Sequence, residues 1–149
     1  MQYHILSEKK QNETELRWLA SHDPLTELYN RKKLKSQFEH ILKQAIFNDR
    51  QGILLVLDLD HFKDINDSCG HNVGDQLLKN VAKALTEISR DNDVLARLGG
   101  DEFAIILPET DLNIAIDVCE KISDRLHGLH FEFEQVRYSI SSSIGIVPF

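Results

Sequence analysis

The chain has little cysteine, no long apolar run and no excess of positive charge. Its two cysteines, Cys69 and Cys119, lie far apart and outside any histidine-containing metal spacing, so free thiols in a reducing cytoplasm are expected rather than a disulfide framework. No apolar stretch approaches the roughly 20 residues of a membrane helix, and no secretory signal is predicted. A formal charge of -7 argues against a broad nucleic-acid surface, although an acidic protein can bind a nucleotide through a metal ion.

The composition and length indicate one globular domain behind an N-terminal extension. The chain has 149 residues, 42% of them hydrophobic and 28% charged, which is typical of a soluble domain with its own core. Residues 1–20 contain no Gly or Pro, and their apolar residues are Ile5, Leu6, Leu16, Trp18 and Leu19. This pattern predicts a linker or signalling helix over 1–20 that leads into a domain over 21–149. The heptad pattern is too short to predict a coiled coil.

Three further helices are predicted from apolar residues at helical spacing. The first follows Asn30, a suitable N-cap, and the third is ended by Gly128. The second follows residues 66–75, which are expected to form a loop. The apolar positions are Leu34, Phe38, Ile41, Leu42 and Ala45 in the first helix, Leu77, Leu78, Val81, Ala82, Leu85 and Ile88 in the second, and Ala115, Val118, Cys119, Ile122 and Leu126 in the third.

Strands are predicted from continuous or alternating apolar residues. Residues 52–60 form a continuous apolar run ended by acids, which indicates a strand buried on both faces. Residues 94–97 and 103–107 flank Gly99 and Gly100, and this dipeptide suits a tight hairpin because both residues accept a positive φ. Residues 131–147 alternate as strands do. The order of elements predicts an α/β fold with a sheet covered by helices.

Four acids lie where two of these strands meet turns. Asp58 and Asp60 end the apolar run, and Asp101 and Glu102 follow the two glycines. Carboxylates gathered this closely repel one another unless a cation joins them, and Mg²⁺ prefers such oxygen ligands together with phosphates. For the GGDE tetrapeptide alone, two acids exposed to solvent on a hairpin are as good an interpretation as a metal site. Two acidic clusters beside buried strands favour a metal site.

Four ordered motifs extend this interpretation to a family. The segment RLGGDEF (97–103) resembles the signature of the GGDEF family, the bacterial diguanylate cyclases, and DLDHFKDIND (58–67), DPLTELYNR (23–31) and GHNVGDQLL (70–78) are similar to the family's other motifs. The resemblance runs from about residue 22 to the C-terminus. It implies a palm-like, nucleotide-cyclase-like mixed sheet flanked by helices. It also implies an enzyme that condenses two GTP molecules into cyclic di-GMP and releases two pyrophosphates.

The resemblance assigns metal and catalytic roles to the acids. Asp58 and Asp101 would ligate Mg²⁺ or Mn²⁺, with the backbone carbonyl of Leu59 as a further ligand. Metal ions can polarise the α-phosphate, lower the pKa of the attacking 3′-hydroxyl and neutralise the leaving pyrophosphate. Glu102 is a candidate second metal ligand or catalytic base.

The resemblance also assigns the nucleotide contacts. Asn66 and Asp75 match positions that read guanine, and a carboxylate suits this role because it accepts from the N1 and N2 hydrogens that adenine lacks. His71 is either part of the base pocket or a solvated histidine. Lys63 and the backbone amides of Phe62 and Lys63 match the segment that faces the β and γ phosphates.

Arg90 and Asp93 form an RxxD sequence at the spacing of the family's product-binding inhibitory site. An arginine can clamp a phosphate or stack on guanine, and the aspartate can bind the base edge. The alternative is a charge pair at a helix end. The position relative to the GGDEF turn favours an inhibitory site for cyclic di-GMP.

The reaction implies a symmetric partner, because each domain holds one GTP and the two substrates attack each other. A homodimer, antiparallel at the active sites, is therefore expected, with GTP as substrate and cyclic di-GMP as product and inhibitor. No nucleic-acid partner is expected. An upstream sensor domain, and tethering of a longer protein to a membrane sensor, stay open.

The family pattern continues beyond residue 149 with a further helix and strand that carry a lysine and an arginine for the phosphates. The chain is therefore expected to be a truncated GGDEF domain with weak or no turnover. The alternatives are a non-catalytic module that binds GTP or cyclic di-GMP, another palm-like nucleotidyl transferase, and a structural dimerisation domain.

Overall fold

The helices predicted from apolar spacing are all present in the structure, a computed structural model that describes the backbone of residues 2–149 and the side chains of residues 7–149. The side chains of Ile5 and Leu6 lie outside the described residues. The elements are α1 (Gln2–Ser21), α2 (Arg31–Phe47), β1 (Ile53–Leu59), α3 (Phe62–Cys69), α4 (His71–Ile88), β2 (Val94–Gly99), β3 (Glu102–Leu107), α5 (Leu112–His127), β4 (Phe131–Phe133), β5 (Val136–Tyr138) and β6 (Ser142–Pro148).

Capping residues fix the ends of the helices that flank the sheet. The Asn30 side chain accepts a hydrogen bond from the Lys33 backbone N–H at 2.9 Å, which confirms the predicted N-cap of α2. Asp111 caps α5 in the same way, and each such cap stabilises its helix by about 1 kcal/mol. Gly128 is the C-cap of α5, as expected.

The predicted loop over residues 66–75 is wrong. The segment lies in two helices, α3 and α4, which are separated by Gly70 at φ 91°. The apolar side chains of α3, Phe62, Ile65 and Cys69, are buried and recur at helical spacing, so they anchor a short helix among polar residues. A glycine with positive φ can end one helix and begin the next, so α3 and α4 are joined by a single residue instead of a loop. Asn66 therefore lies on α3, and His71 and Asp75 lie on α4.

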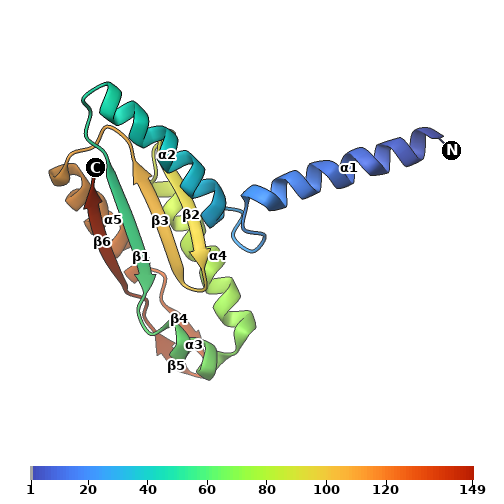
Figure 1. Cartoon of the computed structure of the whole chain (residues 1–149). Coiled ribbons are helices and arrows are strands. Elements are labelled where there is room, and N and C mark those ends of the chain that lie inside the picture. The colour runs from blue at the N-terminus through green and yellow to red at the C-terminus, as the bar shows by residue number, and fades with distance from the viewer. Residues whose placement is uncertain (1) are drawn as a thin grey trace.

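The main sheet has the strand order β2-β3-β1-β6. β1 pairs antiparallel with β3 and with β6, so Asp58 lies opposite Glu102 on one side and Ser143 on the other. The named strand pairs are antiparallel, and a bridge between Tyr29 and Ala96 is parallel. β4 and β5 form a separate two-stranded sheet. Figure 1 shows the four strands between helices, which confirms the expected α/β architecture.

The two faces of the sheet are covered to different extents. Alternate residues of β1, from Ile53 to Leu59, are at most 3% exposed and belong to a core with α4 and α5. On the other face, Leu34 of α2 packs with residues of β2 and β3, whereas Val56 of β1 is 36% exposed. The expectation that β1 is buried on both faces is therefore wrong for the second face, because α2 lies over β2 and β3 (Figure 1).

The N-terminal helix α1 projects away from the sheet and its covering helices (Figure 1). At its base, Trp18 stacks on His22 with ring centroids 4.5 Å apart, and the Asn30 side chain donates to the Ala20 carbonyl at 3.1 Å. Leu16 and Leu19 are 66% and 46% exposed. Among the helices of the described residues, none is long and apolar enough to cross a membrane.

Candidate functional site

Two carboxyl groups meet where β1 ends beside the β2–β3 turn. Asp58 is the next-to-last residue of β1. The backbone N–H of the following residue, Leu59, donates to the Asp101 carbonyl at 3.3 Å. The pKa of Asp58 is raised by partial burial, by a hydrogen bond shared with the Asp101 carboxyl, and by the charges of Asp101 and Asp60. The structure thus brings Asp58 and Asp101 into contact, as a shared cation would require.

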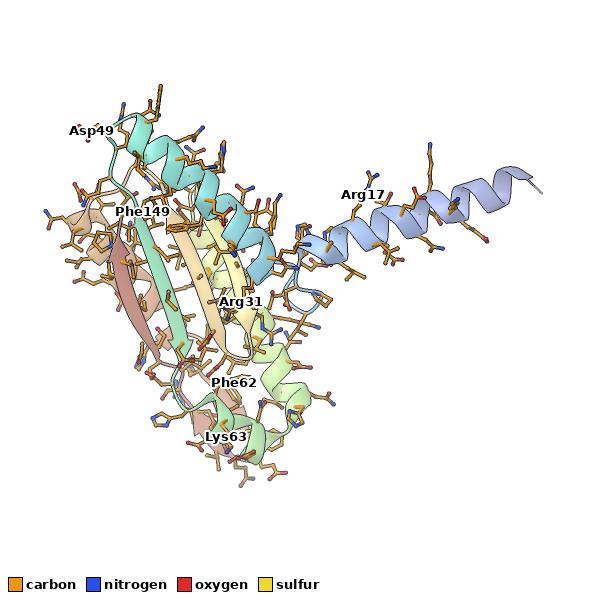
Figure 2. The ribbon with its side chains drawn as sticks, viewed as in Figure 1. Arg17, Arg31, Asp49, Phe62, Lys63 and Phe149 are labelled. Atoms are coloured by element: carbon orange, nitrogen blue, oxygen red, sulfur yellow. The ribbon has the colours of Figure 1, made fainter. Side chains whose placement is uncertain are left out.

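The other two predicted acids make different contacts. The Asp60 carboxylate accepts hydrogen bonds from the hydroxyls of Ser141 (2.9 Å) and Ser143 (2.7 Å), and these bonds lower its pKa. Asp60 therefore joins the end of β1 to β6. The Glu102 carboxylate lies 4.0 Å from the Arg31 guanidinium at the start of α2 (Figure 2), and both side chains are more than half exposed.

The acidic site is a pair of carboxyls rather than a larger cluster. Within the residues that the structure describes, no group of three or more His, Cys, Asp or Glu side chains could hold a metal ion, so the protein side chains available to an ion here are these two carboxyls. Of the three acids expected to act together, Asp58 and Asp101 are neighbours in the structure, and Glu102 is not part of this pair. Glu102 lies opposite Asp58 in the sheet register, so its side chain starts on the same face.

The glycine turn has the predicted backbone. Gly99 and Gly100 have φ of 139° and 52°, values that a residue with a Cβ rarely adopts. Nothing lies within 4 Å of a Cβ built at either position. The two glycines are therefore required by backbone conformation and not by close packing.

An arginine that sequence reasoning missed holds this turn. Arg97 donates from Nε and Nη2 to the Gly100 carbonyl at 3.0 and 2.8 Å, and from Nη1 to both carboxylate oxygens of Asp23 at 3.1 and 3.2 Å. Thr26 adds two hydrogen bonds to the same carboxylate. Asp23 and Arg97 both lie in quoted motifs, but 74 residues separate them, and no local pattern could pair them.

The candidate guanine-reading residues lie on the paired helices α3 and α4. Asn66 is half-buried on α3, and its Oδ1 is buried without a hydrogen-bond partner among the described residues. Asp75 and His71 are exposed near the start of α4. An unsatisfied buried amide atom is uncommon in a folded protein and marks a position that needs explanation.

The candidate phosphate-facing residues begin α3. Figure 2 shows Phe62 and Lys63 at the end of the sheet toward which β1 runs. The Phe62 side chain is 8% exposed and belongs to the core, whereas Lys63 is exposed. Phe62 can therefore offer a ligand its backbone amide but not its ring. This amide is one of the free N–H groups of the first turn of α3.

Arg90 and Asp93 form an ion pair in the connection between α4 and β2. The Arg90 Nη2 donates to Asp93 at 3.1 Å and to the Thr110 hydroxyl at 2.9 Å, and the Arg90 backbone N–H donates to Asp93 at 2.9 Å. The Asp93 side chain is 4% exposed and that of Arg90 is 55% exposed. The predicted alternative, a charge pair beside a helix end, is thus present in the structure.

A cleft of about 660 Å³ borders the same pair. Its wall on the other side is α2, through residues that include Gln37 and Gln44, and Phe149 also lines it. The exposed guanidinium of Arg90 and a neighbouring hollow give a ligand both a charged contact and space. Ion pairing with Asp93 and ligand binding by Arg90 are therefore compatible.

Comparison with known proteins agrees with the motifs. Residues 20–149 match the family model described as diguanylate cyclase, GGDEF domain. The chain is 36% identical over 141 residues to the probable diguanylate cyclase DgcE of Escherichia coli, covering 95% of this chain and 13% of that protein. It is 41% identical over 132 residues to the bifunctional diguanylate cyclase/cyclic di-GMP phosphodiesterase MucR of Pseudomonas aeruginosa, covering 89% and 19%. The chain thus spans less than a fifth of the length of these relatives.

A solved structure has the same fold. The coiled coil and GGDEF domain of DgcB from Caulobacter crescentus, in complex with c-di-GMP, superposes with a TM-score of 0.88 at 26% identity. The superposition covers 99% of this chain and 79% of that chain. With a family model that matches nearly the whole chain, the assignment is direct. The chain belongs to the GGDEF-domain family of diguanylate cyclases.

Proposed function

We propose that this chain is the catalytic domain of a diguanylate cyclase, which joins two GTP molecules into cyclic di-GMP and releases two pyrophosphates. The contact between the Asp58 and Asp101 carboxyls carries this proposal. Burial and the neighbouring Asp101 carboxyl raise the pKa of Asp58, and two carboxyl groups this close favour a bound cation. The names of the relatives DgcE and MucR support the same activity.

The residues of this site suit Mg²⁺ or Mn²⁺, because both ions take hard oxygen ligands. Asp58, Asp101 and the Leu59 carbonyl would hold the ion. A bound ion neutralises phosphate charge and acidifies the attacking 3′-hydroxyl. Glu102 is assigned to a second metal contact or to proton acceptance, since it starts on the same face of the sheet as Asp58.

The chain's own residues orient the nucleotide. The first-turn amides of α3, at Phe62 and Lys63, face the β and γ phosphates, and the Lys63 ammonium adds positive charge. Asp75 accepts from N1–H and N2–H of guanine, and Asn66 and His71 complete the base pocket. Asn66 is only half-buried, so part of its side chain stays accessible to a ligand.

Two copies of the domain are needed to finish the reaction. Each copy presents one GTP, and in an antiparallel homodimer each 3′-hydroxyl attacks the other nucleotide's α-phosphate. The exposed Leu16 and Leu19 on α1 support a role for this helix as a dimerising or signal-transmitting connector over residues 1–20. We place the domain, residues 21–149, in the cytoplasm, where GTP is available.

Turnover of GTP by this chain tests the proposal. The chain is mixed with GTP and Mg²⁺, and cyclic di-GMP is measured by chromatography, with Asp101→Ala as the control. Formation of the product by the wild type alone supports the cyclase. Mg²⁺-dependent GTP binding without product identifies a non-catalytic binding module instead, and the absence of any such binding overturns both.

Replacement of Arg90 tests the inhibitory site. We expect Arg90→Ala to weaken cyclic di-GMP binding about tenfold or more, because hydrogen bonds to charged groups contribute about 1.5–3 kcal/mol. Arg90→Lys keeps a positive charge beside the buried Asp93 carboxylate but loses the planar fork, so it should also bind weakly while folding normally. Calorimetric titration with cyclic di-GMP measures both affinities.

The matched control is Arg125→Ala, because Arg125 also forms an ion pair, with Glu87. This pair lies outside the residues that line the cleft. Unchanged product affinity in Arg90→Ala and Arg90→Lys would contradict the inhibitory site.

A further inference from the structure

Gly74 lies inside a helix at a place where its backbone does not require glycine. It is the fourth residue of α4, and its N–H donates to the Gly70 carbonyl at 3.2 Å. The glycines with positive φ are Gly70, Gly99 and Gly100, so Gly74 does not need glycine's conformational freedom. A glycine at such a position weakens the helix relative to alanine. The reason for it must lie in what surrounds it.

The space beside Gly74 is filled by the amide of Asn66. A Cβ built on Gly74 would lie 1.8 Å from Asn66 Oδ1 and 3.0 Å from Asn66 Cγ, but 3.3 Å from Phe62 Cζ. The ring contact is tight, whereas the amide contact leaves no room for a Cβ unless the Asn66 side chain moves away. Phe62 and Asn66 are four residues apart on α3, so they share the face that packs on α4.

The oxygen end of the Asn66 amide faces Gly74. Its Oδ1 is buried and has no hydrogen-bond partner among the described residues, while the residue is half-buried as a whole. Nδ2 is therefore the end that solvent or a ligand reaches. Asp75, an exposed carboxylate, directly follows Gly74. A donor from α3 and an acceptor from α4 thus lie on adjoining helices.

We propose that Gly74 is a positioning residue for guanine recognition. By leaving room for the buried end of the Asn66 amide, it holds the Nδ2 donor toward the base. A donor beside a carboxylate matches guanine, which presents an oxygen acceptor next to N1–H and N2–H, and opposes adenine, which presents an amino group next to an acceptor. This inference rests on the guanine-reading role proposed above for Asn66 and Asp75.

A double-mutant cycle of Gly74→Ala and Asn66→Ala tests this role. Two quantities are measured for the four proteins: unfolding in urea without metal, and the affinities for GTP and ATP with Mg²⁺. Asn80→Ala, an exposed substitution on the same helix, controls for a change of helix propensity alone. The double variant keeps the test valid should Gly74→Ala fail to fold.

Gly74→Ala alone is expected to destabilise the protein and to reduce the GTP-to-ATP affinity ratio about tenfold. With Asn66→Ala already present, Gly74→Ala should no longer change the ratio, and it should raise the folding equilibrium constant up to about fivefold, since alanine favours a helix interior over glycine. Non-additivity in both measurements supports the inference, because a merely structural role of Gly74 would leave the nucleotide ratio unchanged.

The outcomes separate this inference from the proposed function. A wild type that prefers GTP, with a Gly74→Ala variant of unchanged preference, overturns the positioning role alone. Destabilisation that is equal with and without the Asn66 amide overturns it as well. A wild type that binds no guanine nucleotide overturns the proposed function together with the recognition role of Asn66 and Gly74.

Discussion

Asp58→Asn is expected to reduce cyclic di-GMP formation by more than about 100-fold while leaving the metal-free fold at least as stable as the wild type. The loss is of the size seen when a preorganised electrostatic contact to a transition state is removed. Asparagine keeps the shape of aspartate but lacks its charge and binds a divalent cation poorly. Turnover with Mg²⁺ and thermal unfolding in a chelator are the two measurements.

The stability half of this expectation follows from the direction of the pKa shift. Partial burial, the shared hydrogen bond with Asp101, and the charges of Asp101 and Asp60 raise the pKa of Asp58. A raised pKa means that the folded state disfavours the ionised carboxylate, so ionisation lowers the free energy of unfolding as pH rises through this range. A neutral asparagine at position 58 avoids that cost. An acid retained only for structure would behave in the opposite way.

Asp49→Asn is the matched control for this substitution. Asp49 lies just beyond the C-terminal end of α2, at the opposite end of the sheet from Lys63 (Figure 2). Its φ of 51° is in a region that asparagine also accepts, so the substitution removes one charge without backbone strain. Turnover should stay within about twofold of wild type. If Asp58→Asn retained comparable turnover, or lost stability like a core variant, the metal-site proposal would be wrong.

Sequence patterns predicted the elements that bury a regular apolar face. The apolar residues from Leu77 to Leu85 repeat at helical spacing and form the buried side of α4. The residues on either side of Gly99 and Gly100 form the expected hairpin. Asp58 and Asp101 could be placed together because Asp58 lies near the end of one predicted strand and Asp101 at the start of another. The pairing of β1 with β3 makes these two residues neighbours.

The rest depended on contacts that leave no local pattern. In α3 only Phe62, Ile65 and Cys69 are buried. The polar residues between them are mostly Asp, Asn and Ser, which favour turns as readily as helices. Gly74 was predicted to lie in a loop, where glycine is common. The feature that explains a glycine here is the side chain of Asn66 on another helix, and this contact leaves no pattern in the sequence around Gly74. The half-covered face of β1 depends on where α2 crosses the sheet, which helix periodicity does not specify.

Asp23→Asn should lower the free energy of unfolding by about 2 kcal/mol, the size of charge-assisted hydrogen bonds in a partly buried site. Asp23 and Arg97 are 17% and 15% exposed, so water replaces the lost interaction poorly. For a chain of this length the melting temperature should fall by about 4–8 °C, measured by calorimetry. Glu87→Gln, in an exposed ion pair with Arg125, should change stability by less than about 1 kcal/mol.

The pH dependence of this difference identifies its origin. Burial raises the pKa of Asp23, but hydrogen bonds from Thr26 and the Arg97 guanidinium outweigh burial and lower the pKa overall. A lowered carboxyl pKa contributes stability that is present above the unfolded value of about 4 and is lost as pH falls through the folded value. The gap between wild type and Asp23→Asn should therefore be constant near neutral pH and shrink in acid. A gap that stays constant below about pH 4 would mean that side-chain shape, and not the Asp23 charge, links the start of the domain to Arg97 and the glycine turn.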